Sequence, residues 1–406
     1  MKHILFLQSP LGTFFKHLAQ HFSSQQHCTY KINLNGGDRV YAWADKVYDY
    51  TGLAKDWSDY LNAFYKEHKI TDIVVYGDCR YYHSVAISLA KACGIKVWCF
   101  EEGYLRAGFV TLEENGCNAN SELDLDLVKI NNTDAKTVKS TANVGPTFKK
   151  RLWYGFRYYV EYQRQNKSFI NYIHHRPWTS WQECFFWLSN FRQKWSSMLV
   201  DRLTKRKLIS KHRGNIYLLP LQVRVDFQLR QHSPFASVEE VIKQVIHSFA
   251  TNSEKDKVLV IKHHPQDRGF ISYQKLIKGL TSFYKLEGRV FYVHELNLPK
   301  VYPYLRGVVT VNSTVGLSSL LHSIPTIALG SALYDLPGTT FQGSLDDFWK
   351  SSYRVNSKFF AKFHTYLMQE TQLSGDFYTE RQQLLTLCYQ KMCRTNDDIK
   401  TVQKIA

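Results

Sequence analysis

Residues 72–101 are DIVVYGDCRYYHSVAISLAKACGIKVWCFE. The pattern predicts a strand over Asp72–Tyr76, a helix through Ala92 and a second strand over Lys96–Glu101. Strands separated by a helix of this length pair in parallel, because the helix carries the chain back across the sheet. This stretch therefore predicts a doubly wound α/β fold.

The same alternation continues on both sides of this stretch. Before it we expect strands at His3–Gln8 and Thr29–Leu34, and helices that end at Phe22 and span 56–68. A second series of predicted elements comprises strand Asn215–Pro220, helix 237–250, strand Lys257–Lys262, helix 272–283, strands Val290–Val293 and Gly307–Val311, helix 314–322 and strand Thr326–Leu329. Two such series, joined near residue 210, predict two Rossmann-like lobes with a cleft between them.

This alternation divides the chain into three expected parts. Residues 1–213 form the first lobe, in which about 150–213 are a helical insertion rich in basic and aromatic residues. Residues 214–350 form the second lobe, and 351–406 form C-terminal helices. The polar, turn-rich segment 120–150 is expected to be a loop.

The composition fits two globular domains and an anionic partner. Of the 406 residues 44% are hydrophobic and 10 are prolines, so each domain can bury a core. The formal net charge of +17 indicates nucleic acid, an acidic substrate or an anionic lipid surface. No zinc knuckle, RNP motif or helix-turn-helix pattern occurs, so we expect no nucleic acid partner. A merely basic soluble protein is the alternative.

The cysteines and the N-terminus indicate a cytoplasmic protein. Eight cysteines occur without a CxxC pair and behind no signal peptide, so we expect reduced thiols. The apolar run Met1–Leu7 is far shorter than the roughly 20 residues of a membrane-spanning helix.

A first candidate motif, Glu101-Glu102-Gly103, ends a predicted strand. Open α/β sheets bind ligands at the carboxyl ends of their strands. A carboxylate there can act as general acid or base on a sugar hydroxyl. The structural alternative is a solvated acidic turn.

The second motif is Lys262-His263-His264-Pro265, also at a strand end. A histidine in this place can donate a hydrogen bond to a nucleotide phosphate and stabilise the departing group. A metal site is disfavoured because neighbouring residues of a strand point to opposite faces and no third ligand is close in sequence. A structural histidine pair is the alternative.

The third motif, Asn312-Ser313-Thr314, lies between a strand and a helix. Hydroxyls and backbone N–H groups at a helix N-terminus can bind an anion, although a plain N-cap has the same sequence.

A fourth segment follows the first strand of the second lobe. Gln222, Arg224, Asp226 and Gln228 alternate along it and can therefore share one side. A carboxylate among amides suits a nucleophile or a group that stabilises an oxocarbenium-like centre. A structural salt bridge between Arg224 and Asp226 is the alternative.

Taken together, these motifs resemble a known group of enzymes. Glu101-Glu102-Gly103, His264-Pro265 and Ser313-Thr314 resemble the three motifs of bacterial sialyltransferase-like enzymes, which have the GT-B architecture and use CMP-sugars. Longer strings resemble the KpsS/LipB capsule polysaccharide family over about residues 3–350: Gln8–Gly12, Asn35–Asp38, Gly77–Arg80, Glu102–Arg106, Gly116–Ser121, Pro220–Gln222, His232–Phe235 and Phe341–Trp349.

The resemblance implies a retaining β-Kdo transferase that moves Kdo from CMP-Kdo to lyso-phosphatidylglycerol and so begins a capsule's lipid anchor. Retaining Kdo transferases of related architecture use a carboxylate nucleophile from the second lobe, so the resemblance implies Asp226 as the nucleophile. The chain departs from the family's Asp-Ser-Gln string, because it reads Asp226-Phe227-Gln228. Glu102, or less favourably Glu101, would deprotonate the acceptor, and His264 would assist departure of CMP. A CMP-sialic acid-dependent, inverting transferase and a non-catalytic export accessory protein are the alternatives.

The predicted site contains two further sets of residues. Those expected to bind the CMP-sugar are Ser313, Thr314, Asn312, Lys262, Pro265, Gln222, Arg224 and Gln228. The other expected cleft residues are Glu101, Gly103, Arg106, Asn118, Asn120, Gly12, Asp38, Asp78 and Arg80. No metal or other cofactor is expected, because CMP leaves as a monophosphate.

The expected partners are the CMP-sugar, an anionic phospholipid acceptor and the inner face of the inner membrane, where the protein would be peripheral. A second Kdo transferase and the capsule export complex are further candidates. The basic segment 149–213, including Lys205-Arg206-Lys207, suits an anionic leaflet. A helical insertion that packs on the sheet is its alternative.

Overall fold

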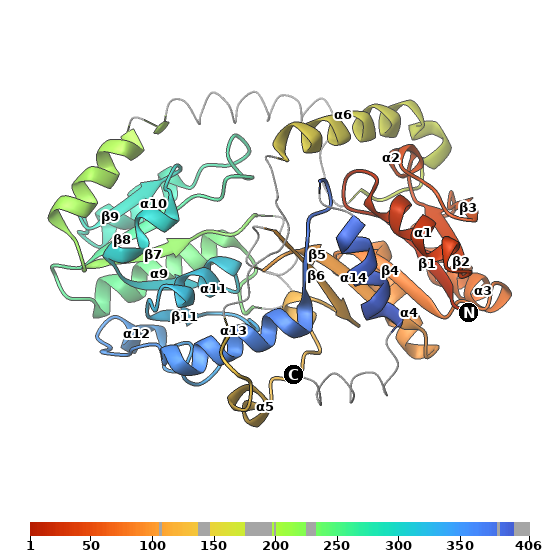
Figure 1. Cartoon of the computed structure of the whole chain (residues 1–406). Coiled ribbons are helices and arrows are strands. Elements are labelled where there is room, and N and C mark those ends of the chain that lie inside the picture. Colours follow the sequence, from red (N-terminus) through yellow and green to blue (C-terminus); the bar gives the residue numbers. More distant parts are fainter. Residues whose placement is uncertain are drawn as a thin grey trace. The chain divides into compact units, whose positions relative to one another are not determined.

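The computed structural model describes residues 1–104, 108–136, 147–174, 197–198, 200–224, 233–379 and 382–393. The chain divides into two compact units (Figure 1). Unit 1 comprises Met1–Asp126, Thr137–His175 and Thr365–Ala406; unit 2 comprises Leu127–Lys136 and Arg176–His364.

Unit 1 is built on a seven-stranded sheet with the order β12-β6-β5-β4-β1-β2-β3. Its strands are β1 (His3–Phe6), β2 (Cys28–Asn33), β3 (Lys46–Asp49), β4 (Asp72–Tyr76), β5 (Lys96–Glu102), β6 (Phe109–Glu114) and β12 (Gln372–Ser374). The strands from β5 to β3 are parallel, whereas β6 pairs antiparallel with both β5 and β12.

Helices cover both faces of this sheet because alternate strand residues point to opposite sides. Leu5 and Ile73 pack with α3 (Trp57–Glu67) and α4 (Tyr81–Ala92), whereas Ile4 packs with helices on the other face. The helices of that second face are α1 (Phe14–Ser24) and α14 (Gln382–Cys393). The unit also contains α2 (Gly36–Val40) and α6 (Phe148–Arg164).

Unit 2 has a five-stranded, wholly parallel sheet with the order β11-β10-β7-β8-β9. Its strands are β7 (Ile216–Pro220), β8 (Val258–Lys262), β9 (Val290–Val293), β10 (Leu305–Thr310) and β11 (Thr326–Ala328). Its helices include α5 (Leu127–Asn131), α9 (Val238–Asn252), α10 (Gln274–Phe283), α11 (Thr314–Leu321) and α12 (Leu345–Phe348). Helix α13 (Ser357–Thr371) begins in unit 2 and ends in unit 1.

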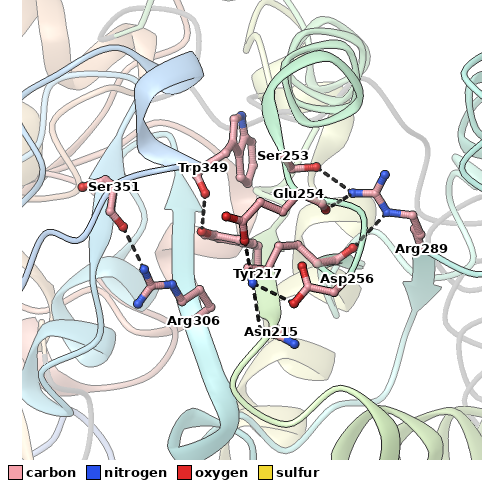
Figure 2. Close-up of polar contacts among 10 residues, drawn as sticks. Asn215, Tyr217, Ser253, Glu254, Asp256, Arg289, Arg306, Trp349 and Ser351 are labelled. Atoms are coloured by element: carbon pink, nitrogen blue, oxygen red, sulfur yellow. Dashed lines mark hydrogen bonds and ion pairs between the residues drawn. The ribbon is translucent and has the colours of Figure 1, made fainter.

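The amino ends of the unit 2 strands are joined by structural contacts (Figure 2). Arg289, just before β9, donates to Ser253 Oγ at 2.8 Å and to the carbonyl of Lys257 at 3.0 Å. Tyr217 in β7 donates to the carbonyl of Trp349 at 3.0 Å. Arg306 donates to the carbonyl of Ser351 at 2.9 Å. These hydrogen bonds occupy polar groups at the amino ends of the strands. The motifs predicted for this unit lie at the opposite, carboxyl ends of the same strands.

The predicted α/β class is confirmed, and most predicted strands and helices occur with ends shifted by a few residues. The sequence analysis missed β3, β6 and β12. β3 and β12 have only four and three residues and lie at the two edges of the sheet, where little hydrophobic periodicity marks them. β6 is longer and lies between β5 and β12. The segment 351–406, expected to be only helical, contributes β12 to unit 1.

The two units also differ from the predicted domain boundaries. Residues 200–213 were expected in the first lobe, yet Leu208 packs in a core of unit 2. Asp201 accepts hydrogen bonds from the backbone N–H groups of His294 and Glu295 at 3.0 and 2.6 Å. This segment is therefore held by the second sheet rather than the first.

Trp349 gives a stability test of unit 2, because it is 1% exposed and its indole N–H donates to Ser248 Oγ at 2.7 Å. We expect Trp349→Ala to lower the free energy of unfolding of this unit by about 3–5 kcal/mol. Trp153→Ala, at an exposed tryptophan of unit 1, should change the free energy of unfolding of its own unit by about 0.5 kcal/mol or less. Calorimetric unfolding of both variants checks this, and equal shifts would contradict the assignment of Trp349 to the core.

Candidate functional site

The carboxyl edge of the unit 1 sheet brings together the acidic residues that the sequence predicted. Glu101 and Glu102 are the last residues of β5, and Asp78 and Arg80 follow the neighbouring strand β4. Glu101 Oε1 accepts the backbone N–H of Glu102 at 3.1 Å. The pKa of Glu101 is raised to about 7, mainly by desolvation, to which the charges of Glu102 and Asp78 add, whereas the hydrogen bond from the Glu102 N–H and the charge of Arg80 oppose the rise.

Glu102 differs from Glu101 in its surroundings. A guanidinium nitrogen of Arg151, from α6, lies 3.7 Å from Glu102 Oε1. That oxygen is buried and has no hydrogen-bond partner among the described residues. The Arg151 guanidinium also lies over the ring of Tyr378, 5.3 Å from its centroid. Neither Arg151 nor Tyr378 was predicted, because they are remote in sequence from every motif.

Asp78 is a structural anchor for the loop after β6. It is 5% exposed, and its Oδ2 accepts the backbone N–H of Cys117 at 3.0 Å and the side-chain amide of Asn120 at 3.1 Å. Asn118 donates its backbone N–H to the Tyr104 hydroxyl at 2.7 Å. The predicted residues Asp78, Asn118 and Asn120 therefore lie together, and their visible bonds shape the loops around Glu101.

Asp38 performs a similar task at the ends of β1 and β2. Its carboxylate accepts from the Gln8 amide at 3.1 Å, from the backbone N–H of Leu34 at 3.0 Å and from the Tyr158 hydroxyl at 3.4 Å. Asp38 is 8% exposed. It was predicted as a cleft residue, and the structure makes it the acceptor that joins two loops to α6.

Two glycines of the predicted strings allow α6 to approach these loops. Gly12 has φ +111°, and a Cβ on it would lie 2.6 Å from the Tyr154 ring. A Cβ on Gly37 would lie 2.6 Å from the ring of Tyr158. Any larger residue at Gly12 or Gly37 would displace the helix. Gly103 is buried beside Phe109.

His83 is a buried residue at this edge that the sequence analysis missed. It is fully buried, and its Nδ1 lies 2.7 Å from the carbonyl of Gly77, so Nδ1 must donate. Desolvation, with the charge of Arg80, lowers the pKa of His83 to about 3. The ring is therefore neutral and holds the turn between Asp78 and β4. A single histidine within a helix gave no signal for this role.

The carboxyl edge of the unit 2 sheet also gathers predicted residues. Gln222, after β7, donates its side-chain amide to Asn312 Oδ1, after β10, at 2.7 Å. Ser313 caps α11, since its Oγ accepts the backbone N–H of Val315 at 3.2 Å. Thr314 is the first residue of that helix and is partly exposed. Residues that are distant in sequence thus meet where β7 and β10 end.

The two histidines after β8 lie in different environments. His263 is fully buried, its Nδ1 lies 2.7 Å from the Tyr292 hydroxyl, and desolvation together with His294 lowers its pKa to about 3. His264 is partly exposed, and its Nδ1 accepts the backbone N–H of Gln266 at 3.2 Å. In the neutral ring that bond leaves the proton on Nε2, which makes Nε2 a hydrogen-bond donor.

Two basic residues complete the described part of this edge. Lys262 is the last residue of β8, and desolvation lowers its pKa, with Arg268 adding to the effect and Glu295 opposing it. Arg224 is exposed, and its backbone N–H donates to Asp267 Oδ2 at 2.7 Å. Pro265 is exposed. The predicted residues Asp226, Gln228 and Arg106 lie outside the described residues.

Within the described ranges, no group of three or more His, Cys, Asp or Glu side chains is arranged to hold a metal ion. Among the same residues, no helix combines the length and the apolar character that a bilayer crossing requires.

These two units, with polar and ionisable groups gathered at the carboxyl edges of parallel sheets, define an α/β protein of the class that binds ligands at strand ends. Residues 71–378 match the family described as capsule polysaccharide biosynthesis protein. The chain belongs to this family.

Two relatives are similar along most of their length. The capsule polysaccharide export protein KpsS of Escherichia coli is 36% identical over 377 residues, which cover 93% of this chain and 97% of the relative. The capsule polysaccharide modification protein LipB of Neisseria meningitidis serogroup B is 34% identical over 389 residues, which cover 93% and 92%. The predicted KpsS/LipB resemblance is therefore confirmed.

A solved structure titled Thermosulfurimonas dismutans KpsC, beta Kdo 2,7 transferase, shows a weak likeness. It is 12% identical, covers 90% of this chain and 99% of its own, and has a TM-score of 0.41. Similarity at that level defines neither fold nor activity.

The carboxyl of Glu101 gives a pH-dependent prediction. Its pKa of about 7 lies above the ordinary value near 4.3, so between those values the folded protein holds a proton that the unfolded chain releases. Stability should therefore fall as the pH rises from about 5 to about 7. We expect Glu101→Gln to remove this part of the pH dependence.

The measurement is the thermal midpoint at several pH values for wild type, Glu101→Gln and a control, Glu114→Gln, at an exposed residue that ends β6. If the thermal midpoints of wild type and Glu101→Gln changed with pH in parallel, Glu101 would have the same pKa in the folded and the unfolded protein, which would contradict the prediction.

Proposed function

We propose that the protein is a retaining β-Kdo transferase that moves Kdo from CMP-Kdo to lyso-phosphatidylglycerol and starts the linker of a capsular polysaccharide. The main support is the contact between Gln222 and Asn312, at 2.7 Å, beside the Ser313 cap. This hydrogen bond joins motifs 90 residues apart in sequence at the carboxyl ends of β7 and β10, and open α/β sheets bind ligands at the carboxyl ends of their strands. Family membership supports the capsule context.

In this proposal, unit 2 binds the donor. The CMP phosphate lies at the N-terminus of α11, where Ser313, Thr314 and backbone N–H groups favour an anion. His264 donates from Nε2 to the phosphate and stabilises its charge as it leaves. Lys262 and Arg224 offset the repulsion between the Kdo carboxylate and the attacking carboxylate, because two like charges would otherwise approach without compensation.

Transfer proceeds by two displacements at the anomeric carbon. Asp226 attacks this carbon and forms a glycosyl ester, while the bond to the phosphate oxygen breaks and CMP leaves with the electron pair. The acceptor hydroxyl then attacks the same carbon, Glu102 takes its proton, and Asp226 is released. Two inversions give net retention.

No divalent ion is required by this scheme, because the leaving group is a monophosphate and the neighbouring cations can stabilise it. Glu101, with a pKa of about 7, is the second candidate for the base, since a base works best when its pKa is near the working pH. We place the protein peripherally at the cytoplasmic face of the inner membrane, where its acceptor lies.

The test follows CMP release and product formation from CMP-Kdo and detergent-dispersed lyso-phosphatidylglycerol. Asp226→Ala should abolish transfer without loss of folding. Glu102→Gln should slow it by at least about 100-fold and should accumulate a protein carrying one Kdo, because its defect lies in the second step. Intact-protein mass spectrometry detects that adduct, and Glu114→Gln is the matched carboxylate control.

Three outcomes would contradict the proposal. Inverted product without any adduct, together with preferred use of CMP-sialic acid, would favour the sialyltransferase alternative. Full activity of Asp226→Ala would show that Asp226 is not the nucleophile. Complete absence of turnover by the folded wild-type protein would favour an accessory role in export.

A further inference from the structure

Among the residues that the structure describes, helix α6 packs on unit 1 through one of its faces. Its residues Tyr154 and Tyr158 contact Gly12 and Gly37, and the Tyr154 carbonyl accepts from the Tyr41 hydroxyl at 3.1 Å. At about 100° per residue these two tyrosines lie on the same side of the helix. This side is the anchored face of α6, and none of the helix's 17 residues is fully buried.

The opposite face of α6 is apolar and exposed to solvent. At the same helical spacing it carries five large side chains that are between 39% and 63% exposed: Phe148, Leu152, Trp153, Phe156 and Val160. Single exposed apolar residues are ordinary, but a contiguous ridge on one helix marks an interaction surface. After the helix end, Ile170 and Ile173 are also exposed, at 78% and 56%.

The same helix carries exposed basic side chains. Lys149, Lys150 and Arg157 are all exposed, and the first turn of α6 contains no acidic residue. An apolar helix face bordered by Lys and Arg is the arrangement of helices that lie in the interface of an anionic bilayer. The charge complementarity favours such a surface over a second copy of this basic chain, whose net charge of +17 would repel it.

We propose that α6 docks the protein on an anionic lipid surface, with its apolar ridge inserted among the acyl chains and its cations at the headgroups. The segment predicted from sequence for membrane contact was 149–213, with Lys205–Lys207 as its test. On the basis of the structure, we assign the membrane contact to Phe148–Val160.

This proposal deepens the proposed function and rests on it in one respect. Arg151, on the first turn of α6, lies 3.7 Å from Glu102, the proposed base. The docked helix would therefore hold Glu102 near the headgroup level, where a lipid acceptor presents its hydroxyl. Vesicle binding itself does not depend on whether Glu102 is catalytic.

The experiment is flotation of the full-length protein with vesicles of phosphatidylglycerol and phosphatidylcholine, compared with phosphatidylcholine alone. We expect binding only to the anionic vesicles and a decline with salt. The double variant Trp153→Ser/Phe156→Ser should weaken binding by at least about tenfold. Lys149→Gln/Lys150→Gln should weaken it roughly tenfold to thirtyfold, since each cation contributes about fivefold.

The matched control is Val47→Ser/Leu53→Ser, two residues of unit 1 that are 47% and 45% exposed and lie outside α6. It should bind vesicles as wild type does. Unchanged binding by both α6 variants would overturn the proposal. So would loss of self-association in lipid-free solution by the α6 variants, measured by analytical ultracentrifugation, because it would assign the ridge to a second copy.

Transfer to detergent-dispersed acceptor separates this inference from the proposed function. If Trp153→Ser/Phe156→Ser retains that activity but loses vesicle binding, both proposals stand. If wild type binds vesicles and shows no transfer, only the enzymatic proposal fails.

Discussion

A carboxylate that loses its water must receive hydrogen bonds from the protein, and in unit 1 this requirement is met at Asp38. Its partners come from three places: the end of β1 through Gln8, the end of β2 through Leu34, and α6 through Tyr158. The nearby ammonium of Lys31 is also buried and donates to the carbonyl of Leu7 at 2.6 Å, and desolvation lowers its pKa to about 8. The position of α6 therefore depends on the hydrogen bond that its Tyr158 donates to the buried carboxylate of Asp38.

The same physical rule separates structural from reactive groups at the two sheet edges. Asp78 and Asp38 are ringed by donors and hold loops in place, as does the neutral imidazole of His83. The Glu101 carboxylate accepts the backbone N–H of Glu102, and burial raises its pKa to about 7, so it can exchange a proton near neutral pH. The same distinction applies in unit 2. His263 is buried against Tyr292 and is structural, whereas His264 is partly exposed and is the candidate for contact with a ligand.

The sequence alone predicted the central strands well, because β4, β5, β7 and β8 are apolar runs separated by helices of regular length. It also predicted that Gln222 and Asn312 belong to one edge, since parallel strands end together. It did not predict β12 or the roles of Arg151 and His83. β12 and Arg151 depend on contacts between segments far apart in the chain, which leave no local pattern. His83 binds the carbonyl of Gly77, only six residues away, but a single histidine within a helix carries no pattern that marks such a bond. Asp226, the expected nucleophile, lies outside the described residues.

The return of the chain to its first sheet has a practical consequence. Beyond unit 2, β12 pairs with β6, and α14 packs against α1 in the core that also contains Phe14 and Phe100. A fragment that stops after unit 2 would expose the β6 edge and one face of that core to solvent, and such edges promote aggregation. Unit 1 is thus discontinuous in sequence, so a recombinant piece that isolates it must join the segments before unit 2 to the segment that starts at Thr365.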